Sequence, residues 1–269
     1  IEGAVLSIAD KADTIAGMFA LGLQPSGSRD PFALRRQANG IVKTIAEHRL
    51  PLNIEQLFRD ALAGYAGSEA EKKFGPKFAS PQGRAEVLRS IRAFLCERLE
   101  FYLRDALGFA YDVVNAVLAA GSDDVVDAAA RAQAVAKVRP SSDFESISIA
   151  FKRMKNILRQ AGELGSEPAA EFHPGALKEP AEVNLAELVP QAAQRVRQLR
   201  ANKDYEPALV EISRLRPAVD TFFDKVMVMV DEPKVRANRL ALLQTVLREF
   251  STIADFSEIV TESKESKAS

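Results

Sequence analysis

The sequence predicts an all-α protein made of two helical modules. Apolar residues recur at intervals of three and four along most of the 269-residue chain, which is the spacing of one helix face. The hydrophobic content of 47% is enough to bury a sizeable core. No segment shows a convincing strand alternation, and Gly, Pro and Ser gather between the periodic segments, where they interrupt helices.

The first part of the chain predicts three helices. Apolar residues at helical spacing mark the first, and the loop after it offers Ser28 or Asp30 as a cap for the second, with Pro31 in its first turn. Asn53 is placed to cap the third. The predicted ranges are 4–22, 31–48 and 53–64. Residues 66–83, rich in Gly, Ser, Lys and Pro, are the predicted linker or mobile loop between domains.

The remainder predicts eight further helices and a disordered polar tail at 262–269. Ser142 and Glu145 have the spacing of a capping box. Residues 226–230, Val-Met-Val-Met-Val, fit either a short buried strand or the end of a helix, and the helical spacing of the flanking apolar residues favours the helix. The predicted helices cover 84–107, 111–119, 125–137, 142–160, 185–200, 205–215, 219–230 and 234–256.

Bulk properties exclude several classes of protein. No apolar run approaches the roughly 18 residues of a membrane span, so we expect no membrane partner. The N-terminus is not typical of a signal peptide, and we expect the chain to begin inside a larger protein. The single cysteine, Cys96, excludes an internal disulfide and is expected to act as a small buried hydrophobe. These features indicate the cytoplasm.

Catalytic and metal-binding patterns are missing from the sequence. Its two histidines, His48 and His173, have no Cys, Asp or Glu at metal-ligand spacing. There is no phosphate-binding glycine loop and no nucleophile elbow. We therefore expect no catalytic residue and no cofactor within this chain.

Positive charge is uneven, although the net charge is only −1. Three clusters in the second half weakly suggest a polyanionic partner, and each alone is typical of a solvated helix face. Their members are Lys152, Arg153, Lys155 and Arg159; Arg195, Arg197, Arg200 and Lys203; and Lys234, Arg236, Arg239 and Arg248.

Long strings along the chain resemble one known family. They are VLSIADKADTIAG (residues 5–17), PSGSRDPFALRR (25–36), AFKRMKNILRQA (150–161), LVEISRLRPAVDTFF (209–223) and RANRLALL (236–243). Together they resemble the β subunit of bacterial glycyl-tRNA synthetase. Ala12 departs from that pattern, where Leu is usual, and so do Met154 and Lys155, where smaller residues are expected.

The resemblance implies a fold and a function. Residues 1–65 would be the end of an HD-like helical module. Residues 84–261 would form the anticodon-binding domain, with leading helices at 84–140 and a DALR-like core at 141–261. The implied role is to grip glycine tRNA for a glycine–tRNA ligase of α2β2 composition, whose α subunit uses ATP and Mg²⁺. No DNA partner is implied.

The residues expected to face tRNA come from the basic clusters. Lys152, Arg153, Lys155, Asn156 and Arg159 are the first set, because charged groups bind phosphates and an amide can pair with a base edge. The second set is Arg195, Arg197, Arg200, Arg236 and Arg239. Arg236 and Arg239 could instead pair with Asp220 and Asp224. Phe222 and Phe223 are expected in the core, with stacking on bases as the alternative.

Two other functions remain open at the level of sequence. A helical scaffold that binds only protein would show the same periodicity, and affinity for a protein but not for tRNA would identify it. An HD-type phosphohydrolase fragment is suggested by Asp10 and Asp13, with Asp10 at the position of a metal ligand in working members of that class. The expected structural role of Asp10 is a contact on a helix face or between helices.

Overall fold

A computed structural model describes residues 1–74, 78 and 80–261. These residues form helices and irregular segments, with two isolated β-bridges in place of any sheet, so the predicted all-α class is confirmed for the part described. The chain folds as two compact units. The first unit contains residues 1–109 and 121–129, and the second contains 110–120 and 130 onward. The predicted disordered tail, 262–269, lies outside the described residues.

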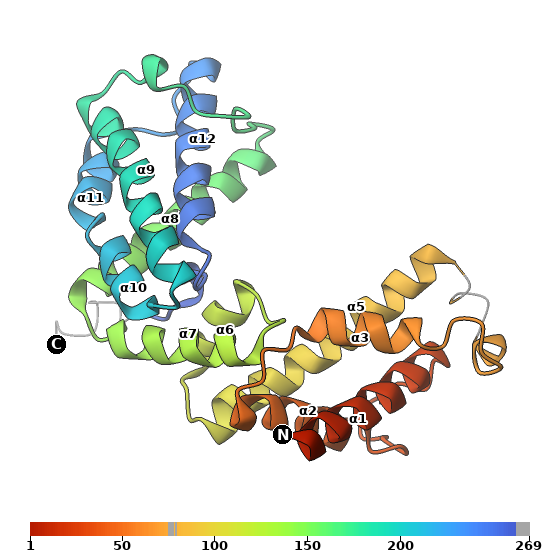
Figure 1. The fold of residues 1–269 in the computed structure, drawn as a ribbon. Coiled ribbons are helices and arrows are strands. Elements are labelled where there is room, and N and C mark those ends of the chain that lie inside the picture. Colours follow the sequence, from red (N-terminus) through yellow and green to blue (C-terminus); the bar gives the residue numbers. More distant parts are fainter. Residues whose placement is uncertain (75–77, 79, 262–269) are drawn as a thin grey trace. The chain divides into compact units, whose positions relative to one another are not determined.

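Within the described residues, the first unit is built mainly from four helices (Figure 1). They are α1 (Glu2–Ala20), α2 (Leu34–His48), α3 (Ile54–Ala63) and α5 (Pro81–Phe101), which continues as a π-helical turn over Tyr102–Ala106. A short 3-10 turn, Glu71–Lys73, follows α3. Helices α1, α2 and α3 all pack against α5 around buried residues such as Ile15, Ile41, Phe58 and Ile91.

Two predicted caps are present in this unit. The Asp30 carboxylate accepts bonds from the amides of Leu34 and Arg35, and the Asn53 side chain accepts one from the Gln56 amide. Each bond satisfies an amide that a helix N-terminus leaves without a partner. Helix α2 begins at Leu34, so Pro31 lies in the preceding turn and not within the helix.

The second unit contains α6 (Tyr111–Ala119), α8 (Ser142–Glu163), α9 (Pro180–Ala201), α10 (Tyr205–Ser213), α11 (Arg216–Lys225) and α12 (Pro233–Phe250). Helix α7 (Val125–Val138) contributes residues to both units. Figure 1 shows α8, α9, α11 and α12 side by side, and contacts join α8 and α9 each to α11 and α12.

Phenylalanines fill the core of the second unit. Phe256, in the 3-10 turn Phe256–Glu258, meets Phe144 and Phe151 of α8 edge-on, at ring-centroid distances of 5.4 and 5.1 Å. All three side chains are fully buried. This C-terminal turn is therefore part of the core, and its packing holds α8 in place.

The compact units differ from the predicted domain boundary. The sequence predicts a boundary at 66–83 and places 84–140 in the second domain, whereas α5 belongs to the first unit. The reason is that a Gly- and Pro-rich segment marks a loop but does not say where the next helix packs, and α5 buries Ile91, Leu95 and Leu99 in the first unit. Part of the 66–83 segment itself is not among the described residues.

Three predicted details at helix ends were wrong. Helix α8 follows Ser141 with no side-chain cap, so the predicted capping box at Ser142 is not formed. Helix α12 ends at Phe250 instead of residue 256. Helix α11 ends at Lys225, and residues 226–230 are not helical, because Val226 and Val228 are buried while Met227 between them is 72% exposed. The alternation fits the extended backbone at Val226, where φ is −117° and ψ is 117°.

Candidate nucleic-acid interface

Helix α8 presents the most available of the predicted tRNA-facing residues. Lys152 and Asn156 lie one turn apart on its surface, and both are exposed. Within the described part of the chain, neither side chain has a hydrogen bond or ion pair. A free ammonium group and a free amide one turn apart can meet a phosphate and a base edge. We call these two residues the α8 face.

Arg153, the neighbour of Lys152, already has an aromatic partner. Its guanidinium carbon lies 4.2 Å from the centroid of the Phe223 ring on α11. Phe222 is fully buried, as predicted for the core, whereas Phe223 is only half-buried and meets Phe222 edge-on. Arg153 is exposed, so its guanidinium stays accessible while its position is set by the ring.

Lys155 and Arg159 are engaged with carboxylates. The Lys155 ammonium donates to Asp255 at 2.7 Å and to the Ser257 hydroxyl at 3.1 Å. The bond to Asp255 raises the pKa of Lys155, against the opposing effect of its own burial. Burial alone would raise the pKa of Asp255, but Lys155 and Ser257 together lower it. Arg159 pairs with Glu163 one turn on, at 2.6 Å.

The second basic cluster, on α9, is mostly paired. Arg195 bonds to Glu211, which also receives Arg214, and Arg197 bonds to Glu249 at 2.6 Å. Arg200 is exposed, and its side chain has no hydrogen bond or ion pair within the described residues. Of the three α9 arginines predicted to face tRNA, Arg200 is thus the one whose charge is not already shared with a carboxylate.

Arg236 and Arg239 are both bonded to other parts of the second unit. Arg239 is buried, pairs with the buried Glu182 of α9, and donates to the Met227 carbonyl at 2.7 Å. Arg236 donates to the Val230 carbonyl at 2.7 Å. The burial and pairing of Arg239 argue against the predicted tRNA contact. In the described part of the chain, neither arginine pairs with the alternative partners Asp220 and Asp224. A buried arginine needs a buried acceptor, and Glu182 is too far along the chain for spacing to reveal it.

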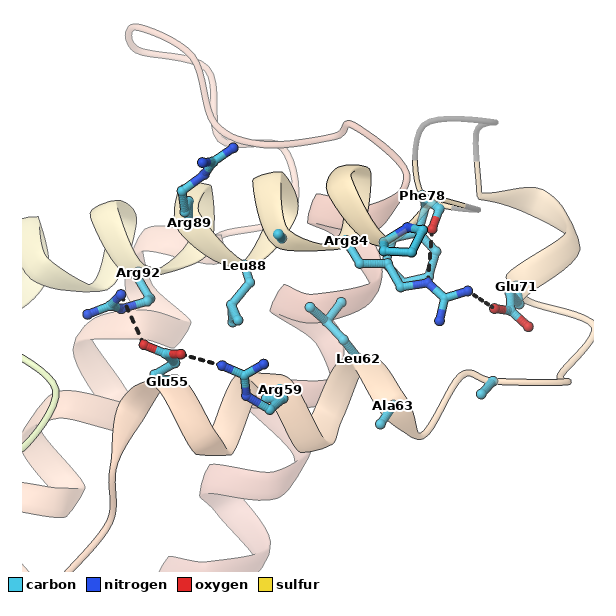
Figure 2. Close-up of a pocket in the computed structure, with 13 residues that line it drawn as sticks. Glu55, Arg59, Leu62, Ala63, Glu71, Phe78, Arg84, Leu88, Arg89 and Arg92 are labelled. Carbon is cyan, nitrogen blue, oxygen red and sulfur yellow. Dashed lines mark hydrogen bonds and ion pairs between the residues drawn. The ribbon is translucent and has the colours of Figure 1, made fainter.

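The first unit contains a pocket lined by arginines that the sequence analysis did not single out. It has a volume of about 470 Å³ and lies between α3 and α5, with Leu62 and Leu88 among its apolar lining residues (Figure 2). Arg59 and Arg92 both reach Glu55, and Arg84 reaches Glu71 at 3.7 Å. Arg92 also bonds to Asp123, which raises the pKa of Arg92.

This pocket differs from the α8 face because most of its arginines are already paired with carboxylates. Figure 2 shows Arg59 and Arg92 on either side of the Glu55 carboxylate, while Arg89 points elsewhere. Arg89 is exposed and is the one arginine of the pocket without a hydrogen bond or ion pair in the described structure. Among the other arginines, Arg92 joins α5 to α3 and to Asp123, Arg84 joins α5 to Glu71, and Arg59 pairs within α3. In the sequence, the feature that could have pointed to this pocket is the spacing of Arg84 and Arg92, which lie eight residues apart on one helix.

Asp10 lies exposed on α1, and its side chain has no hydrogen bond or ion pair in the described structure. It therefore lies on a helix face, and the interhelix contact considered for it does not form. Within the ranges 1–74, 78 and 80–261, no group of three or more His, Cys, Asp or Glu side chains is arranged to hold a metal ion. Over the same ranges, no helix combines the length and apolarity needed to cross a membrane.

Comparison with known proteins was decisive for the family. The sequence profile described as "Glycyl-tRNA synthetase beta subunit" matches residues 1–119, and the profile "DALR anticodon binding domain" matches residues 147–264. A protein of Acidobacterium capsulatum named glycine–tRNA ligase beta subunit is 52% identical over 264 residues, which cover 97% of this chain. The chain belongs to the glycyl-tRNA synthetase beta subunit family.

Two other curated relatives also match nearly the whole of this chain. The glycine–tRNA ligase beta subunits of Desulforamulus reducens and Geobacter metallireducens are 39% and 41% identical, over 98% and 96% of this chain. The matched regions are 35% of the A. capsulatum and G. metallireducens proteins and 36% of the D. reducens protein. The chain thus spans about a third of the length of these curated relatives. The α8 face and Arg200 lie in the region matched by the DALR profile.

Proposed function

We propose that this chain is the tRNA-binding part of the β subunit of a glycine–tRNA ligase and recognises the anticodon region of glycine tRNA. The observation that carries the proposal is the match of the DALR anticodon-binding profile to a region of the second unit whose surface holds uncompensated cations. Lys152, Arg153 and Arg200 supply positive charge, and Asn156 supplies an amide suited to an unpaired base.

The mechanism that follows is positioning. Cations on the second unit bind phosphates with an affinity that falls as salt rises. The Asn156 amide pairs with the edge of an unpaired base, and planar side chains stack on bases. Binding far from the acceptor end contributes to the reaction by aligning that end, since a misplacement of about 1 Å can lower a rate about 100-fold. In this proposal the reaction takes place in the cytoplasm, at the active site of an α subunit that uses ATP and Mg²⁺ within an α2β2 enzyme.

The test is binding of this chain to glycine tRNA over a salt series, with a native and an anticodon-substituted transcript. We expect the affinity to fall as salt rises and to fall again on anticodon substitution. Lys152→Ala and Arg200→Ala should each weaken binding to both transcripts and lower the salt slope by roughly one unit. Asn156→Ala should reduce the difference between the two transcripts, with little effect on the salt slope.

Arg36→Ala provides a charge-matched control. Arg36 lies on α2 in the first unit, is exposed, and its side chain has no hydrogen bond or ion pair within the described residues. Its removal changes the net charge by the same amount as Lys152→Ala, so an equal loss of affinity would show that only overall charge matters. Absence of binding at low salt, or binding that ignores the anticodon, would contradict the proposal.

A further inference from the structure

A groove beside the α8 face has the chemistry of a base-stacking site. It lies between α8 and the segment that joins α11 to α12, with a volume of about 420 Å³. This volume falls in the range of roughly 300–1,000 Å³ that small-molecule sites occupy. Arg153, Phe223, Lys225 and Met227 are among its lining residues. We call it the stacking groove.

A planar pair lies in the groove. The Arg153 guanidinium covers the Phe223 ring at 4.2 Å from the centroid. The Phe223 ring also meets the fully buried Phe222 ring edge-on. Guanidinium planes and aromatic rings are the two surfaces on which proteins stack unpaired bases. Because Arg153 is already held over the ring, it loses little conformational freedom when a base is added.

Met227 is an apolar side chain left in solvent at the same groove. It is 72% exposed, while Val226 and Val228 on either side of it are buried. A flexible thioether can adapt its shape to a flat ligand. An exposed methionine beside an arginine–phenylalanine pair gives the groove a second apolar contact surface that no part of the described chain covers.

Two arginines of α12 hold the backbone around Met227 by hydrogen bonds. Arg239 donates to the Met227 carbonyl and Arg236 to the Val230 carbonyl, and Arg239 is itself held by Glu182. These bonds tie the non-helical segment 226–230 to α12 and, through Glu182, to α9. Arg236 and Arg239 are therefore positioning residues for the groove, although neither of them lines it.

The charge of the groove selects an anionic partner. Lys225 is exposed and, in the described structure, has no hydrogen bond or ion pair, and Lys152 lies next to Arg153 on α8. Against these cations the groove has the single carboxylate of Asp224. Planar stacking surfaces flanked by free lysines fit a nucleotide, whose base is flat and whose phosphate is negative.

We propose that the stacking groove takes one unpaired base of the tRNA, stacked on Arg153 and Phe223 against Met227, with the adjoining phosphates at Lys225 and Lys152. This inference rests on the proposed function, because it assigns a place on the protein to part of the same ligand. It assigns sequence-tolerant stacking to the groove and leaves base-edge pairing to Asn156.

The test uses transcripts of glycine tRNA that carry a fluorescent base analogue at one unpaired anticodon-loop position at a time. Stacking quenches such analogues, so one position should be quenched when the wild-type chain binds. Met227→Ala and Phe223→Leu should restore its fluorescence and weaken binding by between about 5- and 150-fold, with the salt slope unchanged. Lys225→Ala should lower the salt slope by roughly one unit and leave the quenching in the bound complex intact.

The choice of variants separates stacking from loss of structure. Met227 is largely exposed, so Met227→Ala leaves the core untouched, and circular dichroism checks the fold of Phe223→Leu. Val210→Ala serves as a control, since Val210 is an apolar residue of α10 that is 43% exposed and does not line the groove. It should leave both quenching and affinity as in the wild type.

Each outcome has a distinct meaning. Anticodon-dependent binding in which no position responds to Met227→Ala or Phe223→Leu would overturn the stacking groove and leave the proposed function standing. Absence of tRNA binding by the wild-type chain would overturn both. Binding of an apolar peptide in the groove, with tRNA affinity unaffected by all three groove variants, would assign the groove to a protein partner and also reject the inference.

Discussion

Removing Arg239 tests whether the buried pair with Glu182 organises the second unit. The Glu182 side chain is 1% exposed and that of Arg239 is 7% exposed. Arg239→Ala leaves a buried carboxylate without its cation, a change that typically costs about 3–5 kcal/mol. The other Glu182 oxygen still accepts a bond from the Lys178 amide at 2.9 Å, which places the expected loss near the lower end, about 3 kcal/mol.

This loss is large compared with the marginal stability of a typical domain, roughly 5–15 kcal/mol. Urea unfolding followed by circular dichroism would measure the free energy of unfolding. Hydrogen exchange read by mass spectrometry would locate the change, which we expect in residues 226–250 of the second unit. Exchange in α1 and α2 should not change, and these helices therefore serve as an internal reference.

Two further variants separate the buried pair from other effects. Arg248→Ala removes an arginine from the same helix, but Arg248 is 68% exposed and lies 3.7 Å from Glu249, so we expect a change within about 0.5 kcal/mol. Glu182→Gln combined with Arg239→Met removes both charges and should recover most of the lost stability. A cost for Arg239→Ala no greater than that of Arg248→Ala would refute the reasoning.

Three predictions concern other contacts, two about pH dependence and one about packing. Tyr65 donates to the Asp13 backbone carbonyl at 3.0 Å. Burial, together with the nearby Asp13 side chain, raises the pKa of Tyr65 to about 12. The raised pKa stabilises the fold below pH 10 and ceases to do so as the pH rises from 10 to about 12, so Tyr65→Phe should differ least from wild type in unfolding free energy at the top of that range. A Cβ at Gly17 would lie 2.6 Å from the Tyr65 hydroxyl, so Gly17→Ala should destabilise the wild type. In a Tyr65→Ala background, where the clash is absent, the same change should stabilise the fold by about 1 kcal/mol because alanine favours a helix more than glycine does. A double-mutant cycle measures both effects, and equal effects in the two backgrounds would contradict this contact. The pKa of Asp255 is lowered in spite of its burial, so Asp255 should lose its stabilising effect as the pH falls below about 4. Lys155→Ala removes its partner and should make the unfolding free energy depend less on pH in that range. If Lys155→Ala left this acid dependence unchanged, the Lys155–Asp255 pair would not be the cause.

Local sequence signals predicted the helices well for a physical reason. Asp30 and Asn53 were identified as capping candidates because a cap bonds to amides only a few residues away, and both caps are present. Apolar spacing located α6 at its observed bounds, Tyr111–Ala119. The segment 226–230 failed because five apolar residues in a row satisfy both the helical period and the strand period. Its backbone was decided by Arg236 and Arg239, which no local pattern connects to it.

The candidate site was harder to predict because charge compensation is a long-range property. Lys155 and Asp255 are 100 residues apart, Arg197 and Glu249 are 52 apart, and the sequence does not reveal that they meet. Only the Arg159–Glu163 pair, one turn apart, could have been predicted from spacing. Counting basic residues therefore overstated the cationic surface of the second unit.

The pairing pattern changes what mutagenesis of the basic clusters should reveal. Lys155, Arg195 and Arg197 each share a carboxylate, so replacing one of them by alanine both removes a cation and exposes or frees an anion. Weaker tRNA binding by such a variant would not identify a contact, because an unpaired Glu or Asp repels phosphate on its own. Lys152, Arg200 and Lys225 have no such partner in the described structure, so for them a loss of affinity and a lower salt slope can be assigned to the side chain that was removed.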